Sequence, residues 1–143
     1  MQKKAFTLLE LIILIIIIGV LASLAIPRFL GIVEFSRSVE ALSSIGTISR
    51  SMERCFMGTN DYDLCLLNSP GPDPDNLDVD NPGTAPGAHF DYRVNPLGAP
   101  FKYRITATRN ALDNGTAGDH ITFTYREDGS VTKSGTGAFA SIH

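Results

Sequence analysis

The chain has few histidines and few cysteines. Its 143 residues include only three histidines (His89, His120 and His143) and two cysteines (Cys55 and Cys65). The sequence suggests no Ser-His-Asp or Cys-His set, and it contains no HExxH motif and no phosphate-binding glycine loop. The two cysteines lack the paired spacing and the nearby histidines of a zinc site. We therefore expect a protein that is not an enzyme and that needs no cofactor.

The chain also lacks an excess of basic residues. Lys and Arg number 12 against 15 Asp and Glu, which gives a net charge of −3. Proteins that bind nucleic acid through its phosphates normally show a basic excess or a basic face. The balance thus disfavours nucleic acid as a partner, although it does not exclude a local basic patch. The length suits one domain of ordinary size.

Charge is absent from one long apolar run near the start of the chain. After Glu10, residues 11–26 carry no charged side chain, and Lys3 and Lys4 precede the run. A helix over residues 5–26 would extend about 33 Å, which matches a bilayer core of about 30 Å. The two lysines would place the N-terminus in the cytoplasm. The run therefore predicts a membrane segment. A carboxylate inside a bilayer is energetically costly, so Glu10 is expected to have a function there.

Two simple interpretations of this run compete. One is a plain transmembrane anchor that keeps its N-terminus. The other is a secretory signal cleaved after the small residues Ser23 and Ala25, which would leave a mature chain beginning at Ile26. Glu10 is an unhelpful charge at the start of a signal's apolar region, so the secretory signal is the weaker of the two.

A third interpretation follows from the residues around Glu10. The segment Lys3-Lys4-Ala5-Phe6-Thr7-Leu8-Leu9-Glu10 resembles the leader and first mature residues of type IV pilins. The resemblance implies a leader of residues 1–5, cleavage between Ala5 and Phe6, and methylation of the new Phe6 amine. Gly19 and Pro27 also fall where many members have Gly and Pro, whereas Ala5 replaces the Gly that nearly always precedes the cut.

The resemblance gives Glu10 a role in assembly. Cleavage creates an α-amino group on Phe6, and Glu10 of an incoming subunit would compensate the amine of its neighbour, with Thr7 as a nearby hydrogen-bond donor. A buried charge without its partner costs several kcal/mol, so such a pair would set the register of the filament. The alternative is that Glu10 reaches the headgroups near the end of the helix.

The helical pattern continues beyond the membrane segment. Apolar residues recur at spacings of three and four, which predicts one buried stripe: Val39, Leu42, Ile45, Ile48, Met52, Cys55 and Phe56. Gly58-Thr59-Asn60 is a stop signal, so one helix is predicted from about residue 6 to 57. Residues 6–27, here called the assembly segment, precede an extracytoplasmic head of residues 28–143. Gly19 and Pro27 weaken the helix, which either unwinds between them in a filament or keeps a gentle kink.

Residues 58–88 are predicted to form an irregular loop rich in Pro, Gly, Asp and Asn. Because an extracytoplasmic location is oxidising, Cys55 and Cys65 are predicted to form a disulfide at its start. The loop contains four closely spaced acids that form a weak candidate for an irregular calcium site: Asp73, Asp75, Asp78 and Asp80. They do not match the EF-hand pattern, so turns in a solvated loop are the preferred interpretation.

The last part of the chain alternates polar and apolar residues. Residues 89–94, 101–106, 121–126 and 131–133 read as strands joined by turns, which predicts an antiparallel meander of three or four strands over 89–143. Its apolar side chains are predicted to face the helix: Phe101, Tyr103, Ile105, Ile121, Phe123 and Tyr125. His89 and His120 are expected in solvent at strand starts. The fold class is thus α+β, one long N-terminal helix packed on a sheet.

These features predict a structural subunit of a type IV pilus-like filament that serves adhesion, motility or DNA uptake. The implied partners are copies of the chain in a helical filament, a prepilin peptidase, and an inner-membrane assembly machinery with a cytoplasmic ATPase. The subunit would lie in the inner membrane before assembly and in a surface filament afterwards. The alternatives are a pseudopilin of a type II secretion system and a monomeric, membrane-anchored binding domain.

Overall fold

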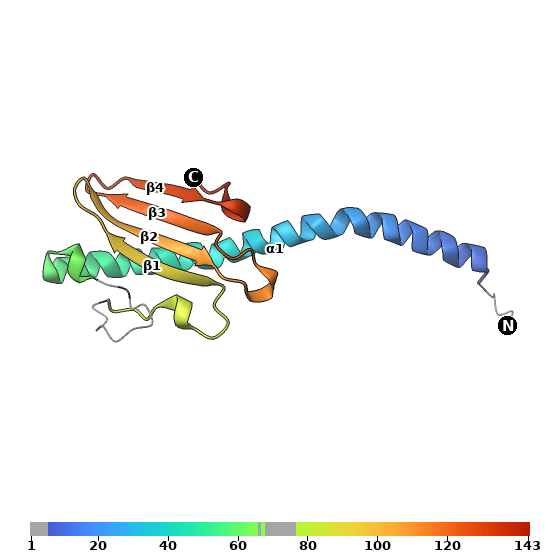
Figure 1. Cartoon of the computed structure of the whole chain (residues 1–143), viewed down its shortest axis with the longest axis horizontal. Helices are drawn as coiled ribbons and strands as arrows, with labels where there is room; N and C mark the ends of the chain where they lie inside the picture. The colour runs from blue at the N-terminus through green and yellow to red at the C-terminus, as the bar shows by residue number, and fades with distance from the viewer. Residues whose placement is uncertain (1–5, 66, 68–76) are drawn as a thin grey trace. The chain divides into compact units, whose positions relative to one another are not determined.

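The described part of the chain is built mainly from one long helix and one antiparallel sheet. The structure, a computed structural model, describes residues 6–65, 67 and 77–143, so the predicted leader lies outside the described residues. Helix α1 (Leu8–Thr59) precedes a four-stranded sheet in the order β1-β2-β3-β4 (Figure 1). This confirms the predicted α+β fold. The chain divides into two compact units, one ending at Val33 and one running from Glu34 to His143.

The sheet is a simple antiparallel meander in which each strand pairs with the next along the chain. Its strands are β1 (Phe90–Pro96), β2 (Phe101–Arg109), β3 (His120–Arg126) and β4 (Val131–Gly135). The turn before β4 contains Gly129 at φ 82°, a left-handed conformation that glycine adopts without strain. Short 3₁₀ turns cover Tyr62–Leu64, Pro82–Thr84, Leu112–Asn114 and Gly137–Phe139.

The core lies between one face of the sheet and the part of α1 that belongs to the second unit. Its buried apolar side chains are Ala41, Ile45, Ile48, Met52, Cys65, Leu67, Leu77, Phe90, Tyr92, Tyr103, Ile105, Ala107, Ile121 and Phe139. Most of the predicted helix stripe and most of the predicted strand residues are therefore correct. Phe123 and Tyr125 are partly buried and pack against the same core.

Two core predictions are wrong. Val39 is 58% exposed, because the buried line on α1 passes through the small residues Ser38 and Ala41 instead. Phe101 pairs with Arg126 rather than facing the helix, because an irregularity in the ladder between Phe101 and Tyr103 changes the register there. Such a bulge turns the side chains on either side of it toward different faces. The Arg126 guanidinium lies 4.6 Å from the centre of the Phe101 ring.

Helix α1 ends where its stop signal predicts. Asn60 follows the last helical residue with φ 56°, and its backbone N–H donates to the Phe56 carbonyl at 2.7 Å. A left-handed Asn after the last turn is a common helix terminator. The predicted disulfide between Cys55 and Cys65 is present and holds the following turn against the helix end. The Tyr62 ring of that turn stacks on Phe56 with ring centres 4.2 Å apart.

Candidate assembly segment and the polar contacts of the head

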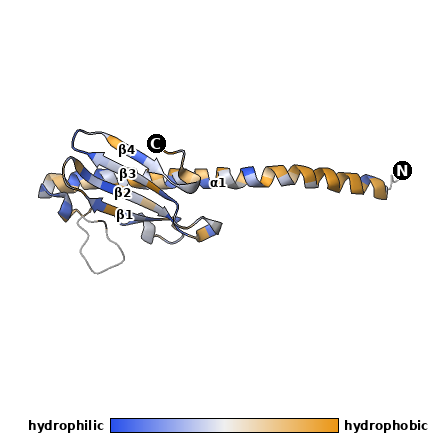
Figure 2. Cartoon of the chain, turned by 45° about the horizontal axis from the view of Figure 1, so that its top comes forward, coloured by the Kyte–Doolittle hydropathy of each residue, from blue (hydrophilic) through white to orange (hydrophobic). Residues whose placement is uncertain are grey.

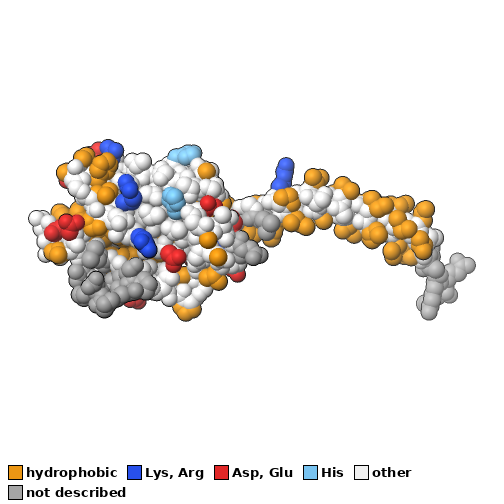
Figure 3. All heavy atoms as spheres, viewed as in Figure 1, with side chains coloured by type: hydrophobic (Ala, Val, Ile, Leu, Met, Phe, Trp, Pro, Cys, Tyr) orange, Lys and Arg blue, Asp and Glu red, His pale blue; other side chains and the backbone are white. Residues whose placement is uncertain are grey.

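The assembly segment presents apolar side chains on all sides. Its large apolar residues from Phe6 to Ile26 are each between 43% and 77% exposed. Figure 2 colours this part of α1 as hydrophobic, and Figure 3 shows hydrophobic side chains along it. By length and composition α1 can cross a membrane. A continuous exposed apolar surface of this kind needs lipid or other protein to cover it.

Thr7 and Glu10 form a local pair at the start of α1. The Glu10 backbone N–H donates to Thr7 Oγ1 at 3.3 Å, and the Thr7 hydroxyl donates to Glu10 Oε2 at 3.5 Å. This is close to the capping-box pattern, in which Thr precedes a helix and Glu lies three residues later. The acid also lies where the helix dipole favours negative charge. Thr7 therefore caps the start of α1 and Glu10 bonds the capping hydroxyl, a local contact that the sequence interpretation missed although Thr-x-x-Glu signals it.

Gly19 and Pro27 both lie inside a continuous helix in this single chain. Apart from the chain neighbours of Gly19 and the nearby helix backbone, no described atom lies within 4 Å of the position that a Cβ on Gly19 would take. Packing within the chain therefore does not require glycine there. Unwinding of the helix between Gly19 and Pro27 in a filament remains a prediction.

A buried arginine joins α1 to the sheet. The Arg109 side chain is fully buried, and its Nε and Nη2 donate to the two carboxylate oxygens of Glu34 at 3.1 and 3.2 Å. The guanidinium also donates to neutral oxygens: the backbone carbonyls of His89 at 3.1 Å and Leu112 at 2.8 Å, and both the backbone and the side-chain oxygen of Asn110. A Cβ on Gly115 would lie 2.2 Å from Arg109 Cζ, so the β2–β3 connection lies directly against the guanidinium.

His89 extends this contact into a wider network, which we call the helix–loop ion network: Glu34, Arg37, Glu40, His89, Arg109 and Asp113. His89 was expected in solvent, but its Nδ1 lies 3.0 Å from Glu40 and its Nε2 3.0 Å from Asp113. The side chain is only 23% exposed. The expectation failed because Glu40 and Asp113 are distant in sequence and meet His89 only in the folded head. The hydrogen bond from His89 lowers the pKa of Asp113.

His120, at the start of β3, makes local side-chain contacts. His120 was also expected in solvent and is instead partly buried. Its Nδ1 lies 3.2 Å from the Gly118 carbonyl oxygen and 3.3 Å from Thr136 Oγ1. These contacts tie the start of β3 to the residue after β4. They are local and suggest no chemistry.

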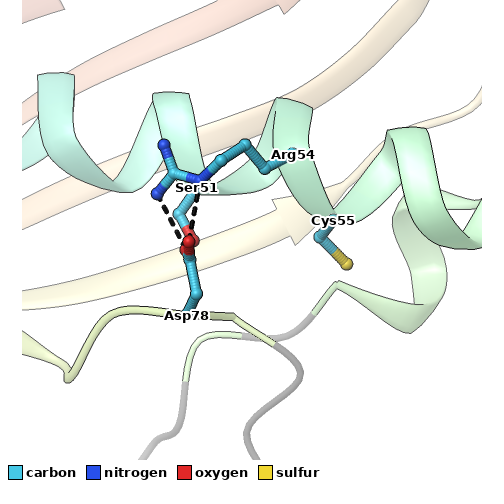
Figure 4. A pocket seen from close by; sticks show the side chains of 4 residues that line it. All are labelled: Ser51, Arg54, Cys55 and Asp78. Carbon is cyan, nitrogen blue, oxygen red and sulfur yellow. Dashed lines mark hydrogen bonds and ion pairs between the residues drawn. The ribbon is translucent and has the colours of Figure 1, made fainter.

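Asp78 is held by α1 rather than left available to a cation (Figure 4). Its carboxylate accepts hydrogen bonds from Arg54 Nε at 2.7 Å, from Arg54 Nη2 at 2.8 Å and from the Ser51 hydroxyl. The Arg54 guanidinium, followed by Ser51, lowers the pKa of Asp78 to about 2. Ser51, Arg54, Cys55 and Asp78 line a shallow pocket of about 220 Å³.

This arrangement does not support the weak candidate for a calcium site at Asp73, Asp75, Asp78 and Asp80. The Asp78 carboxylate is neutralised by an arginine, which a cation would have to displace. Asp73 and Asp75 lie outside the described residues, and Asp80 is exposed. Within residues 6–65, 67 and 77–143, no group of three His, Cys, Asp or Glu side chains is placed to hold a metal ion.

Comparison with known proteins decides the family. No protein-family model matches the chain. The Type IV major fimbrial protein FimA of Dichelobacter nodosus is 31% identical over 122 residues, which cover 74% of this chain and 75% of the relative. The chain belongs to the type IV pilin family. The pilin is also similar to the Type II secretion system core protein G of Escherichia coli, 34% identical over 61 residues that cover 43% and 42% of the two chains.

A second core protein G aligns with more of the chain, at lower identity. The pilin is 24% identical to core protein G of Pseudomonas aeruginosa over 120 residues, covering 78% of this chain and 80% of the relative. These relatives make the pilin a pilus-like structural subunit and imply assembly from many copies. The apolar N-terminal helix fits a subunit anchored in a membrane.

Two groups of side chains in the pilin head escaped the sequence analysis. Arg109 occupies the next inward position after Tyr103, Ile105 and Ala107, so the alternation of β2 could have indicated a buried arginine. His89 carried no comparable signal, because its two carboxylate partners lie 49 and 24 residues away. Both groups hold the head together and offer no catalytic chemistry.

Proposed function

We propose that this pilin is a structural subunit of a type IV pilus-like filament, which polymerises through residues 6–27 after residues 1–5 are removed. The observation that carries the proposal is the assembly segment, whose large apolar side chains are exposed around a single acid, Glu10. In the membrane, lipid covers this surface. In a filament, the same segments of neighbouring subunits cover one another.

Glu10 would select the position at which an incoming subunit stops. Removal of residues 1–5 leaves a positively charged amine on Phe6, and the amine and the acid both lose water when apolar helices pack around them. An unpaired buried charge is strongly unfavourable, so assembly favours the position where Glu10 meets the Phe6 amine of a neighbour. Thr7 already bonds Glu10 within the chain and would orient its carboxylate.

Removal of residues 1–5 and assembly of the mature chain would require two cellular partners. A prepilin peptidase would cut between Ala5 and Phe6 and methylate the Phe6 amine. An inner-membrane assembly machinery with a cytoplasmic ATPase would draw subunits from the inner membrane into the filament. The head would then lie on the surface of an extracellular filament that serves adhesion, motility or DNA uptake.

The N-terminus of the assembled protein tests the proposal most directly. Filaments sheared from the cells of the source organism are analysed by mass spectrometry. The expected mature chain begins at a methylated Phe6. A chain that begins at Met1 would support an uncleaved anchor, and one that begins at Ile26 would support a secretory signal. Either result would overturn the proposal.

The role of Glu10 can be tested separately. Glu10→Ala is expected to leave the protein in the membrane but to reduce the number of filaments about tenfold or more, since it leaves the amine of a neighbour unpaired. Ser23→Ala is a matched control because Ser23 is a polar side chain of the same segment that bonds only its own helix, at the Val20 carbonyl. Normal filaments from Glu10→Ala would refute this role.

A pseudopilin of a type II secretion system is the second candidate, favoured by the likeness to core protein G. It predicts that deletion of the gene stops release of a folded periplasmic protein while long surface filaments are unaffected. The pilus proposal predicts the reverse. Electron microscopy of the cells and assay of the culture medium distinguish the two.

A further inference from the structure

Three arginines form a diagonal row across the face of the sheet that points away from α1. Tyr92, Ile105 and Tyr125 turn toward the core, so their neighbours Arg93, Arg104 and Arg126 turn outward. In the ladders, Arg93 pairs with Thr106 and Arg104 pairs with Thr124. Thr106 is two residues from Arg104, and Thr124 is two residues from Arg126. Neighbouring arginines of the row are therefore diagonal neighbours on adjacent strands, a spacing of about 7–8 Å.

These arginines lack the partners that other arginines of the head have. Arg37, Arg54 and Arg109 each lie within 3.3 Å of a carboxylate oxygen. Among the residues that the structure describes, no carboxylate forms an ion pair with any arginine of the row. Asp128 lies in the turn after β3, where hydrogen bonds from Ser130 lower the pKa of its carboxyl and the charge of Arg126 helps to lower it. Basic side chains cross the sheet face seen in Figure 3. The row is thus a local positive surface on a chain whose net charge is −3.

The surroundings of the row supply hydroxyl groups. The outward positions of β2, β3 and β4 carry hydroxyl side chains that surround the arginines: Thr106, Thr108, Thr122, Thr124, Thr132 and Ser134. Thr124 Oγ1 accepts from Arg104 Nε at 3.3 Å, a long bond that leaves the other guanidinium donors to solvent. Asp91 is the one acid at the outward positions of these strands.

We propose that this face of the pilin head, the arginine row with its hydroxyl border, binds an acidic polysaccharide. Guanidinium groups would bind carboxylate or sulfate groups along the polymer, and the Thr and Ser hydroxyls would bond sugar hydroxyls. The inference deepens the proposed function, because it rests on the head lying outside the cell, and it names the chemistry of a surface ligand.

Nucleic acid fits this face less well. Duplex DNA carries one charge per about 1.7 Å of its axis, and a protein of net negative charge with three arginines that lack ion pairs is repelled by that density. Single strands need open aromatic faces on which bases stack. Phe101 is on this face, but the Arg126 guanidinium covers its ring at 4.6 Å. A polymer with sparser charge and many hydroxyls therefore suits the face better.

The test measures binding to the full chain in detergent micelles, so that it does not depend on polymerisation. The probe is a fluorescent alginate oligomer, a polyuronate, and a neutral dextran oligomer of equal length is its control. We expect alginate to bind and dextran not to bind, with affinity falling as salt rises. No alginate binding, or tighter binding of a short duplex DNA, would overturn the proposal.

Substitutions assign the binding to the row. Arg93→Gln together with Arg104→Gln is expected to weaken alginate binding about tenfold or more, since two guanidinium groups that would donate charged hydrogen bonds to the polymer are lost. Arg126 is left unchanged in this variant because it packs on Phe101. Arg50→Gln is the control, since Arg50 is an exposed arginine of α1 that has only a long bond to Thr47. Equal loss in the control would refute the assignment.

The same variants separate this inference from the proposed function. Arg93→Gln with Arg104→Gln is expected to form filaments in normal number, whereas Glu10→Ala is expected to bind alginate normally in micelles. Loss of filaments in the arginine variant would assign the row to contacts between subunits and overturn the polysaccharide proposal. Failure of the natural chain to form filaments, with alginate binding intact, would overturn the filament proposal alone.

Discussion

Loss of the Glu34 carboxylate is expected to destabilise the head strongly. Glu34→Gln keeps the size of the side chain but removes the charge that faces Arg109. Two hydrogen bonds of 3.1 and 3.2 Å then lose their charged acceptor, while the guanidinium stays fully buried. Four bonds remain to the neutral oxygens of His89, Asn110 and Leu112, and these cannot balance a full positive charge.

The size of the effect follows from this geometry. Breaking a fully buried ion pair by removing one partner costs about 3–5 kcal/mol. The Glu34 side chain is 21% exposed, so water partly compensates the guanidinium, and we expect a loss of about 2–4 kcal/mol. For a domain near 100 residues this lowers the melting temperature by roughly 10–20 °C.

The assay can be confined to the head. The chain has no tryptophan, and its four tyrosines, Tyr62, Tyr92, Tyr103 and Tyr125, all lie in the second unit. Near-ultraviolet circular dichroism of the tyrosines therefore follows unfolding of the head, without the signal of the assembly segment. The full chain is heated in detergent micelles, and the natural chain and the variant are compared.

Glu40→Gln is the matched control. It also removes an acid of the helix–loop ion network, but Glu40 is 45% exposed, and exposed pairs are worth about 1 kcal/mol or less. A second variant, Glu34→Gln with Arg109→Met, removes both charges and is expected to recover part of the lost stability. Equal small losses from Glu34→Gln and Glu40→Gln would refute the reasoning, since burial of Arg109 would then have no energetic consequence.

Three further predictions concern the end of α1 and the acids of the head. Cys55→Ser opens the bridge to Cys65 and should lower the free energy of unfolding by about 3 kcal/mol in urea denaturation, as should reduction of the natural chain. Asn60→Gly should keep the melting temperature, whereas Asn60→Val, strained at φ 56°, should lose about 1–2 kcal/mol. Because folding lowers the pKa of Glu34 and Asp78, the folded head binds fewer protons than the unfolded chain below about pH 4.5. The stability present above that pH is therefore lost as the pH falls toward 2; tyrosine dichroism should show this, and Asp78→Asn should flatten the most acidic part of the curve.

Local patterns in the sequence were enough for the main elements. The spacing of Ile45, Ile48 and Met52 identified the buried side of α1, and the stop signal placed the helix end within two residues of Thr59. Alternation placed all four strands, and the setting of Cys55 and Cys65 indicated their disulfide. These features depend on neighbours close along the chain, so periodicity and turn chemistry are sufficient to find them.

Contacts between distant segments were decided only by the tertiary structure. Arg109 is buried because Glu34, 75 residues away, lies opposite it. His89 leaves solvent because two distant acids surround it, and Phe101 leaves the core because a bulge changes the register of its strand. The sequence alone therefore determined the helix and the four strands, and it identified Glu10 as the single acid of the assembly segment. Only the packed head decided which charges form ion pairs and which arginines lack them, because burial and pairing depend on partners that folding brings together.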